Sequence, residues 1–241
     1  MRWITLLGVI VGSMIVVVTG CTGSSSQEEK PYAPHINPAD FTTAIDNKFF
    51  PLKPGTTFFY KGKSQDATKR DEMVVTHDTK RIMGVECVVV SDKATENGEL
   101  VEQTLDWFAQ DKEGNVWYFG EDSKESENGK VTSTEGSWEA GKDGAKPGII
   151  MQAHPEVGQP YRQEYYKGVA EDMAQVLSFN ESASVPYGSF DHLLVTRDWN
   201  PLEPGQEVVR KYYAAGVGKI MEVPARGLPE PIELVDVKST G

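Results

Sequence analysis

The segment from residue 82 to 120 decides the fold. It reads IMGVECVVV (82–90), SDKATENGE (91–99), LVEQTLDWFA (100–109), QDKEGN (110–115) and VWYFG (116–120). The first, third and fifth pieces are rich in β-branched and aromatic residues, whereas Asn97-Gly98 and residues 112–115 have turn chemistry. Connections this short join antiparallel neighbours, because parallel strands need crossovers of a dozen or more residues. The segment therefore predicts an antiparallel β-meander.

The same pattern extends to both sides of this segment. Further strands are expected at residues 56–61, 73–77, 162–166, 176–179, 193–199, 208–213, 218–223 and 232–238. The one helical piece is expected at residues 168–175, and the polar, glycine-rich stretch 120–146 is expected to form a solvated hairpin or a flap over the sheet. The predicted fold class is mainly β, with a single curved antiparallel meander sheet or half-barrel over residues 40–241.

Composition narrows the class of protein. The 241 residues carry 24 Lys and Arg against 36 Asp and Glu, a formal net charge of −12, and 10% of them are aromatic. Such an acidic chain does not fit a nucleic-acid binder that relies on a basic face. Its aromatic and β-branched content also argues against a chain that is disordered throughout.

The N-terminal stretch has the pattern of an export signal. Arg2 precedes an apolar run from Ile4 to Val18, which fits a secretory signal peptide. The run ends in Val18-Thr19-Gly20-Cys21, which resembles the bacterial lipobox. That resemblance implies cleavage after Gly20 and a diacylglyceryl group on the Cys21 thiol. An uncleaved N-terminal anchor and a signal peptide cut elsewhere are the alternatives.

This reading divides the chain into three parts. Residues 1–20 are expected to be a signal peptide, residues 21–39 a lipidated, flexible tether, and residues 40–241 an extracytoplasmic β domain. The expected partner is a membrane, contacted through the lipid and from the side facing away from the cytoplasm. Cys87, the other cysteine, lies in an apolar strand pattern and is expected to be an inert core residue.

Several short motifs support a resemblance to known extracytoplasmic domains. They are NKFFPLKPGTTFFY (47–60), IMGVECVV (82–89), VPYGSF (185–190) and KYYAAGVGKI (211–220). Together they resemble a family of uncharacterised extracytoplasmic domains and are similar to the curved sheets of LolA-like lipoprotein carriers. The resemblance implies a curved sheet, LolA-like or lipocalin-like, whose concave face holds an apolar ligand.

Two groups of residues are candidates for ligand binding. Arg162, Glu164 and Tyr166 would share one face of a strand, where a charged pair could orient a polar head group. Four tryptophans, Trp107, Trp117, Trp138 and Trp199, could line an apolar cavity. A solvated strand face for the first group and ordinary core packing for the second are the alternatives.

Catalytic and metal-binding signatures are missing from the sequence. The four histidines do not stand at metal-ligand spacing, and no nucleophile elbow, P-loop or dinucleotide fingerprint is present. Asp111, Glu113 and Asn115 superficially resemble a calcium loop, but their glycine is misplaced and a hairpin turn is expected instead. Neither a metal nor a cofactor is therefore expected.

The sequence predicts a non-catalytic, lipid-anchored binding protein of the cell envelope. Its ligand would be an apolar or amphipathic small molecule, or a protein partner, held on the concave face of the sheet. One alternative is an envelope hydrolase or processing enzyme that uses Glu164 and Asp172 with His154 as the base. The other is a structural role in envelope assembly.

Overall fold

A computed structural model describes residues 31–64, 67–203, 208–224 and 230–240. The predicted signal peptide and Cys21 lie outside the described residues. Residues Pro34–Gly241 form one compact unit. Within the described residues no helix is both long and apolar enough to cross a membrane.

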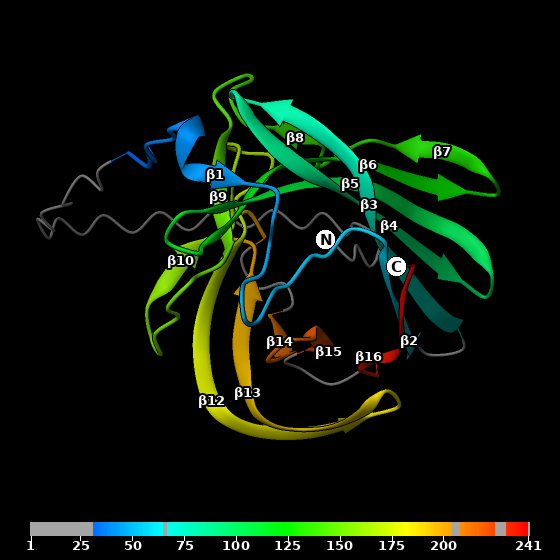
Figure 1. Cartoon of the computed structure of the whole chain (residues 1–241). Helices are drawn as coiled ribbons and strands as arrows, with labels where there is room; N and C mark the ends of the chain where they lie inside the picture. Colours follow the sequence, from blue (N-terminus) through cyan, green and yellow to red (C-terminus); the bar gives the residue numbers. More distant parts are fainter. Residues whose placement is uncertain (1–30, 65–66, 204–207, 225–229, 241) are drawn as a thin grey trace, which may run out of the picture. The chain divides into compact units, whose positions relative to one another are not determined.

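The compact unit is nearly all β (Figure 1). A short 3-10 helix, η1 (Pro38–Asp40), precedes the sheet. The strands are β1 (Phe41–Thr42), β2 (Thr56–Ser64), β3 (Ala67–Ile82), β4 (Val85–Glu96), β5 (Glu99–Asp111), β6 (Val116–Glu127), β7 (Lys130–Ser133), β8 (Trp138–Glu139), β9 (Lys146–Met151), β10 (Pro160–Arg162), β11 (Glu164–Tyr165), β12 (Met173–Val185), β13 (Gly188–Trp199), β14 (Val209–Ala214), β15 (Gly218–Pro224) and β16 (Ile232–Ser239). The predicted fold class is confirmed.

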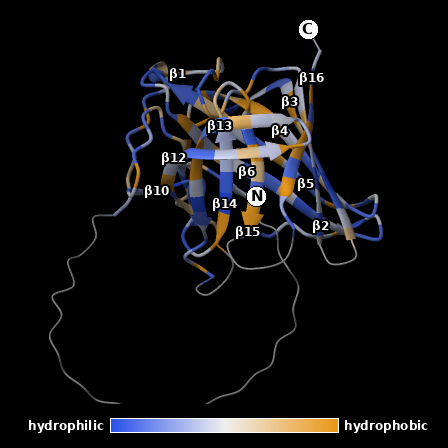
Figure 2. Ribbon diagram, turned by 90° about the horizontal axis from the view of Figure 1, so that it is seen from below, coloured by the Kyte–Doolittle hydropathy of each residue, from blue (hydrophilic) through white to orange (hydrophobic). Residues whose placement is uncertain are grey.

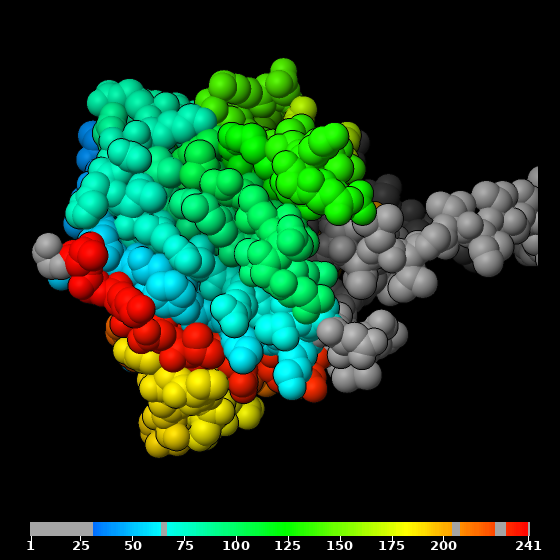
Figure 3. Space-filling view, turned by 90° about the vertical axis from the view of Figure 1, so that its right-hand side faces the viewer, coloured from blue at the N-terminus to red at the C-terminus, as the bar shows by residue number. Residues whose placement is uncertain are grey.

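One antiparallel sheet takes up almost every strand, in the order β10-β12-β13-β14-β15-β16-β2-β3-β4-β5-β6-β9-β11. The C-terminal strand β16 pairs with β2, and Figure 3 shows this red strand along the cyan one. The two end strands of the order, β10 and β11, are separated in the chain only by Gln163. The sheet therefore curls into a nearly closed, barrel-like form whose seam lies at residues 160–165.

A glycine makes this seam feasible. A Cβ on Gly148 of β9 would collide with the backbone carbonyl of Gln163, so no other residue fits there without displacement. Gln163 donates its backbone N–H to the carbonyl of Asp172 at 2.8 Å, and Glu164 donates to the same carbonyl at 3.2 Å. These contacts fix Glu164 at the seam.

Two sequence predictions are wrong in this region. Residues 168–175 form a turn and the beginning of β12 rather than a helix. The single strand expected at residues 162–166 is split at Gln163, because Arg162 pairs with β12 whereas Glu164 pairs with β9. Arg162, Glu164 and Tyr166 therefore do not share one strand face.

The core combines alternating strand residues with an inserted loop. Hydrophobic and hydrophilic residues alternate along the strands in Figure 2. Ile45, Phe49 and Leu52, which precede β2, are buried with the strand residues in one hydrophobic cluster. Cys87 is 0% exposed in this cluster, and burial, followed by the nearby Glu86 carboxylate, raises the pKa of its thiol to about 12. Its predicted place in the core is confirmed.

The stretch from residue 120 to 146 is partly the hairpin that its composition predicted. Strands β6 and β7 form that hairpin, but the chain then returns to the sheet and pairs Trp138 of β8 with Glu121 of β6. Gly120, with a positive φ of 130°, is required here, because a Cβ would collide with the Trp138 carbonyl. Trp138 is 4% exposed and belongs to the core.

Candidate functional site

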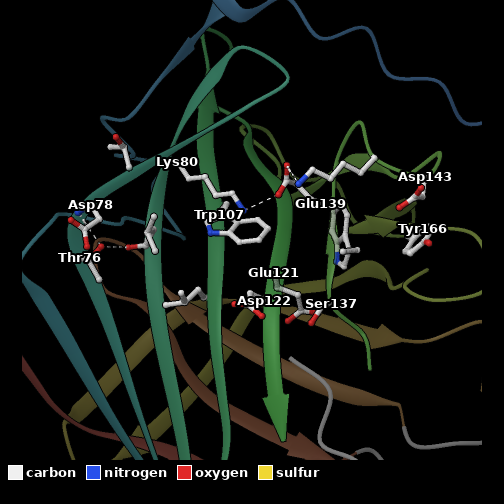
Figure 4. Close-up of a pocket in the computed structure, with 15 residues that line it drawn as sticks. Thr76, Asp78, Lys80, Trp107, Glu121, Asp122, Ser137, Glu139, Asp143 and Tyr166 are labelled. Atoms are coloured by element: carbon white, nitrogen blue, oxygen red, sulfur yellow. Dashed lines mark hydrogen bonds and ion pairs between the residues drawn. The ribbon is translucent and has the colours of Figure 1, made fainter. Parts of the chain in front are cut away.

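An open pocket of about 750 Å³ lies against β3 to β6 and the segment that returns through β8 (Figure 4). We call it the Trp pocket. Its lining residues include Lys80, Leu105, Trp107, Glu121, Asp122, Ser137, Trp138, Glu139 and Tyr166. Three of the seven predicted ligand-binding residues, Trp107, Trp138 and Tyr166, thus meet in one place.

Strand alternation shows which face of the sheet carries the pocket. Leu105 and Trp107 of β5 line it, whereas the alternate residues Thr104, Asp106 and Phe108 point to the other face. Asp106 and Phe108 pair with Val90 and Val88 of β4 and face the interior of the curved sheet. Leu105 and Trp107 therefore reach the Trp pocket from the convex side of this wall, whereas Glu121, which pairs directly with Asp106, belongs to the other face.

A cation and a carboxylate define one side of the pocket. The ammonium of Lys80 lies 3.2 Å from the centre of the Trp107 ring, and it forms an ion pair of 2.8 Å with Glu139. Lys142 adds a second ion pair to Glu139, at 2.9 Å. Burial alone would raise the pKa of Glu139, but the hydrogen bonds from the two lysines outweigh it and lower that pKa. Glu139 therefore stays ionised.

The indole N–H of Trp138 is the unusual group in the pocket. Its ring packs edge-on against Tyr118, with 5.4 Å between the ring centres. The Nε1 atom is buried and has no hydrogen-bond partner in the described part of the chain. A buried donor without an acceptor is costly, and the described residues supply none to this N–H.

A second group of residues lies on the interior face of the sheet from β3 to β6. Its members are buried carboxyl groups: Asp71 on β3, Asp92 on β4, Asp106 on β5, Glu121 on β6 and Glu164 on β11. We call these five residues the acidic belt. Asp71 and Asp92 are 3% and 5% exposed, whereas their chain neighbours Glu72 and Lys93 are exposed on the outside. Alternation thus turns the acids inward.

Strand register makes successive members of the belt neighbours. Asp71 pairs with Ala94, two residues beyond Asp92, and Asp106 pairs directly with Glu121. Asp106 accepts hydrogen bonds from Tyr118 at 2.5 Å and Thr104 at 3.0 Å. Glu121 is also one of the residues that line the Trp pocket.

Burial controls the protonation of the belt. It is the main cause that raises the pKa of all five carboxyls, and for Glu121 the result is about 7. The carboxylate of Asp71 further raises the pKa of Asp92, and that of Asp172 further raises the pKa of Glu164. Burial thus disfavours the charged form of each belt carboxyl relative to that of an exposed acid.

The other predicted site residues lie elsewhere. Trp117 donates its Nε1–H to Asp111 at 2.7 Å and packs against Phe41. Arg162 pairs with Glu171 at 3.6 Å, and Trp199 stacks with Arg197. None of the three lines the Trp pocket.

The residues of the hydrolase alternative are only partly brought together. Burial and then the Asp172 carboxylate raise the pKa of Glu164, so these two acids lie near each other. His154 is exposed, and no hydrogen bond or ion pair within the described ranges joins it to either acid. The calcium-like stretch forms the expected turn, in which the backbone N–H of Asn115 donates to Asp111 Oδ1 at 2.8 Å.

Several of these residues could have been found by a closer reading of the strand pattern. Asp92 continues the inward series Val88, Val90, and Asp106 precedes Phe108 in the same phase. An acidic residue at a position where the strand alternation calls for an apolar residue indicates a carboxyl that points inward. Lys80 and Glu139 carry no such signal, since their meeting depends on the return of residues 134–145 to the sheet.

Comparison with known proteins identifies no family. No protein-family model matches the chain, and no curated protein matches its sequence. Two crystal structures share a similar course of the backbone. One, from Bacteroides fragilis, is provisionally described as an exported protein with a YmcC-like fold. Its sequence is 14% identical to this chain, and the alignment covers 80% of this chain and 100% of that one, with a TM-score of 0.47. The other, provisionally described as a lipoprotein from Parabacteroides distasonis, is 12% identical with the same coverage and a TM-score of 0.41. Likenesses this slight carry no argument about function.

Proposed function

We propose that this protein is a lipid-anchored, extracytoplasmic binding protein that holds an amphipathic small molecule in the Trp pocket without transforming it. The observation that carries the proposal is a pocket of about 750 Å³ in which Trp107, Trp138 and Tyr166 meet an ion pair of Lys80 with Glu139. Pockets for small molecules commonly span roughly 300–1,000 Å³ and combine apolar walls with a few placed polar groups.

The lining of the pocket supports an amphipathic ligand. Leu105, Trp107 and Tyr166 offer an apolar wall for a hydrocarbon or ring system. Trp138 Nε1 offers a donor to a carbonyl, hydroxyl or anionic oxygen of the ligand. The ion pair of Lys80 with Glu139 adds a charged edge that can contact a polar head group.

The proposed location rests on the N-terminal sequence. The lipobox-like Val18-Thr19-Gly20-Cys21 supports a thioether-linked lipid and export from the cytoplasm. Two or more acyl chains hold a protein stably to a membrane, whereas a single chain holds only marginally. Replacing Cys21 with serine should release the protein from washed membranes, and a C21S variant that stays as firmly bound as the wild type would contradict the lipid anchor.

Ligand binding can be tested first on the protein as its host makes it. Native mass spectrometry of protein purified in mild detergent should show a bound small molecule besides the N-terminal lipid. The mass of the free lipoprotein alone would count against the proposal.

The place of binding can be tested with the dye 1-anilinonaphthalene-8-sulfonate, which joins an aromatic body to a sulfonate acceptor. Excitation of tryptophan should produce dye emission, because Trp107 and Trp138 lie in the pocket. Trp138→Phe should weaken dye binding roughly tenfold, the equivalent of one hydrogen bond of about 1.4 kcal/mol. Trp117→Phe is the matched control and should leave the affinity unchanged, since Trp117 bonds to Asp111 outside the pocket. Equal affinities for both variants would place the dye elsewhere.

A further inference from the structure

Two arginines stand opposite each other on the outer side of the sheet. Arg197 of β13 pairs directly with Arg210 of β14, and both side chains are exposed. Strand alternation turns their chain neighbours Asp198 and Lys211 inward, where these two form an ion pair of 2.8 Å. The two guanidinium groups therefore belong to the outer surface, and like charges directly opposite each other destabilise a sheet.

No acid balances this pair of arginines. Within the described ranges no ion pair joins either guanidinium group to a carboxylate. The residues that pair with them on the flanking strands are Gln175 of β12 and Val223 of β15, and neither is charged. We call these four residues, Gln175, Arg197, Arg210 and Val223, the arginine row.

Another cross-strand pair of exposed cations does have an acid beside it. Lys61 of β2 pairs with Arg70 of β3 on the outer face, and Glu233 of β16 pairs directly with Lys61. Thr95 of β4 ends this row, because it pairs with Arg70. We call these four residues, Glu233, Lys61, Arg70 and Thr95, the mixed row. The arginine row thus carries an excess of positive charge that the mixed row does not.

The surface beside the arginine row is aromatic and apolar. Trp199 follows Arg197 on the same face of β13, and the Arg197 guanidinium lies 4.9 Å from the centre of its ring. Tyr212 and Met221 pair with each other on the same face of β14 and β15. All three neighbours are half-buried, so part of each side chain reaches solvent. Tryptophan, tyrosine and arginine join an apolar body to a polar end, which suits the boundary between water and a bilayer.

We infer that the outer face of β12 to β15, around the arginine row, is the surface with which the domain rests on anionic lipid head groups. This inference rests on the proposed lipid anchor, which brings the domain to a bilayer, and it adds the orientation of the domain there. Guanidinium groups bind phosphate oxygens through paired hydrogen bonds, and the arginine row offers two such groups without an acid.

The acidic net charge of the chain does not prevent such docking. The formal charge of −12 repels an anionic membrane as a whole, but charges farther apart than about 8–10 Å are largely screened at physiological salt. The charge of the nearest residues therefore decides which face approaches the lipid. Because the anchor keeps the domain beside the membrane at a high effective concentration, a weak surface is sufficient to orient it.

A fluorescent label at the end of each row tests the inference on the full lipoprotein. Val223→Cys places the label in the arginine row, and Thr95→Cys places it in the mixed row as the matched control. Cys87 is buried, so the introduced thiol is the one that reacts. The labelled protein is added to preformed vesicles of equal parts phosphatidylcholine and phosphatidylglycerol that contain a lipid with a nitroxide head group as quencher.

We expect strong quenching at residue 223 and weak quenching at residue 95, and we expect the difference to vanish on vesicles of phosphatidylcholine alone. Equal quenching at the two positions on the anionic vesicles would overturn the inference. Flotation of the vesicles reports separately on the anchor. Protein that floats with both kinds of vesicle but shows equal quenching would keep the anchor and lose the docking face, whereas protein that floats with neither would overturn both.

Charge variants separate the arginine row from general surface charge. Arg197→Gln with Arg210→Gln should weaken docking roughly thirtyfold, the effect of two basic residues at an anionic membrane surface. Lys61→Gln with Arg70→Gln removes the same charge from the mixed row and should have little effect. Equal losses in both double variants would sink the docking face. Unchanged dye binding to the R197Q/R210Q variant would show that the Trp pocket and the fold are intact.

Discussion

The wall from β3 to β6 and the wall from β13 to β15 bury charge in the same sheet by different means. On the second wall each buried acid has a lysine. Burial by itself favours the neutral form of each group, but the carboxylates of Asp198 and Glu222 raise the pKa of Lys211. In the same way, the ammonium groups of Lys219 and Lys211 lower the pKa of Glu222. On the first wall, no ion pair within the described ranges gives a belt acid a lysine of its own, and burial raises the pKa of each acid. The contrast teaches that a lysine keeps the buried acids of the second wall ionised, whereas burial on the first wall favours protonated acids.

The largest expected effect comes from breaking an ion pair of the second wall. Lys211→Met leaves the buried Asp198 carboxylate without its cation, which should cost about 3–5 kcal/mol of unfolding free energy. Urea denaturation at pH 7 measures the loss. The double variant Lys211→Met with Asp198→Leu should recover most of it, because both charges are then removed. If the double variant is no more stable than K211M, the pair is not the source of the effect.

The next effect concerns the pH dependence of the first wall. The pKa of Glu121 rises from 4.5 to about 7 on folding, so the native state binds more protons than the unfolded chain in that window. Stability from this group is fully present below pH 4.5 and is lost as the pH rises to about 7, by up to about 3 kcal/mol. Glu121→Gln imitates the protonated acid and should flatten this part of the stability curve. An unchanged slope in E121Q would assign the pH dependence to another group.

The strand pattern predicted the fold far better than the site. Runs such as residues 100–109 combine period two with Asn-Gly turns, and those signals depend only on neighbouring residues. The strand at residues 146–151 is not predicted from the sequence, because Pro147-Gly148 is typical of a turn. In the structure, Gly148 is required because the backbone of Gln163 passes too close to leave room for a Cβ. Contacts between distant segments, such as Lys80 with Trp107 and Glu139, depend on how the chain returns to the sheet. No local pattern encodes that return.

A smaller effect tests whether the first wall carries more charge than its own stability favours. Burial, followed by the Asp71 carboxylate, raises the pKa of Asp92 well above its usual value and so favours a proton on its carboxyl. Asp92→Asn supplies an amide N–H in place of that proton, so the variant should be about 1 kcal/mol more stable than the wild type at pH 8. Thermal unfolding followed by circular dichroism measures the difference. A clear loss of stability at pH 8 would mean that the wall needs the ionised carboxylate.

The smallest expected change in unfolding free energy comes from an ion pair that is shorter than that of Lys211 with Asp198. Arg81 and Glu86 lie 2.6 Å apart on the β3–β4 hairpin, closer than Lys211 and Asp198, but their side chains are 68% and 43% exposed. Water and salt screen such a pair, and ordering two long side chains opposes it, so Arg81→Ala should change the unfolding free energy by at most about 0.5 kcal/mol. The same urea titration measures it beside K211M. A loss of more than about 1 kcal/mol would show that distance, rather than burial, sets the contribution of charge in this sheet.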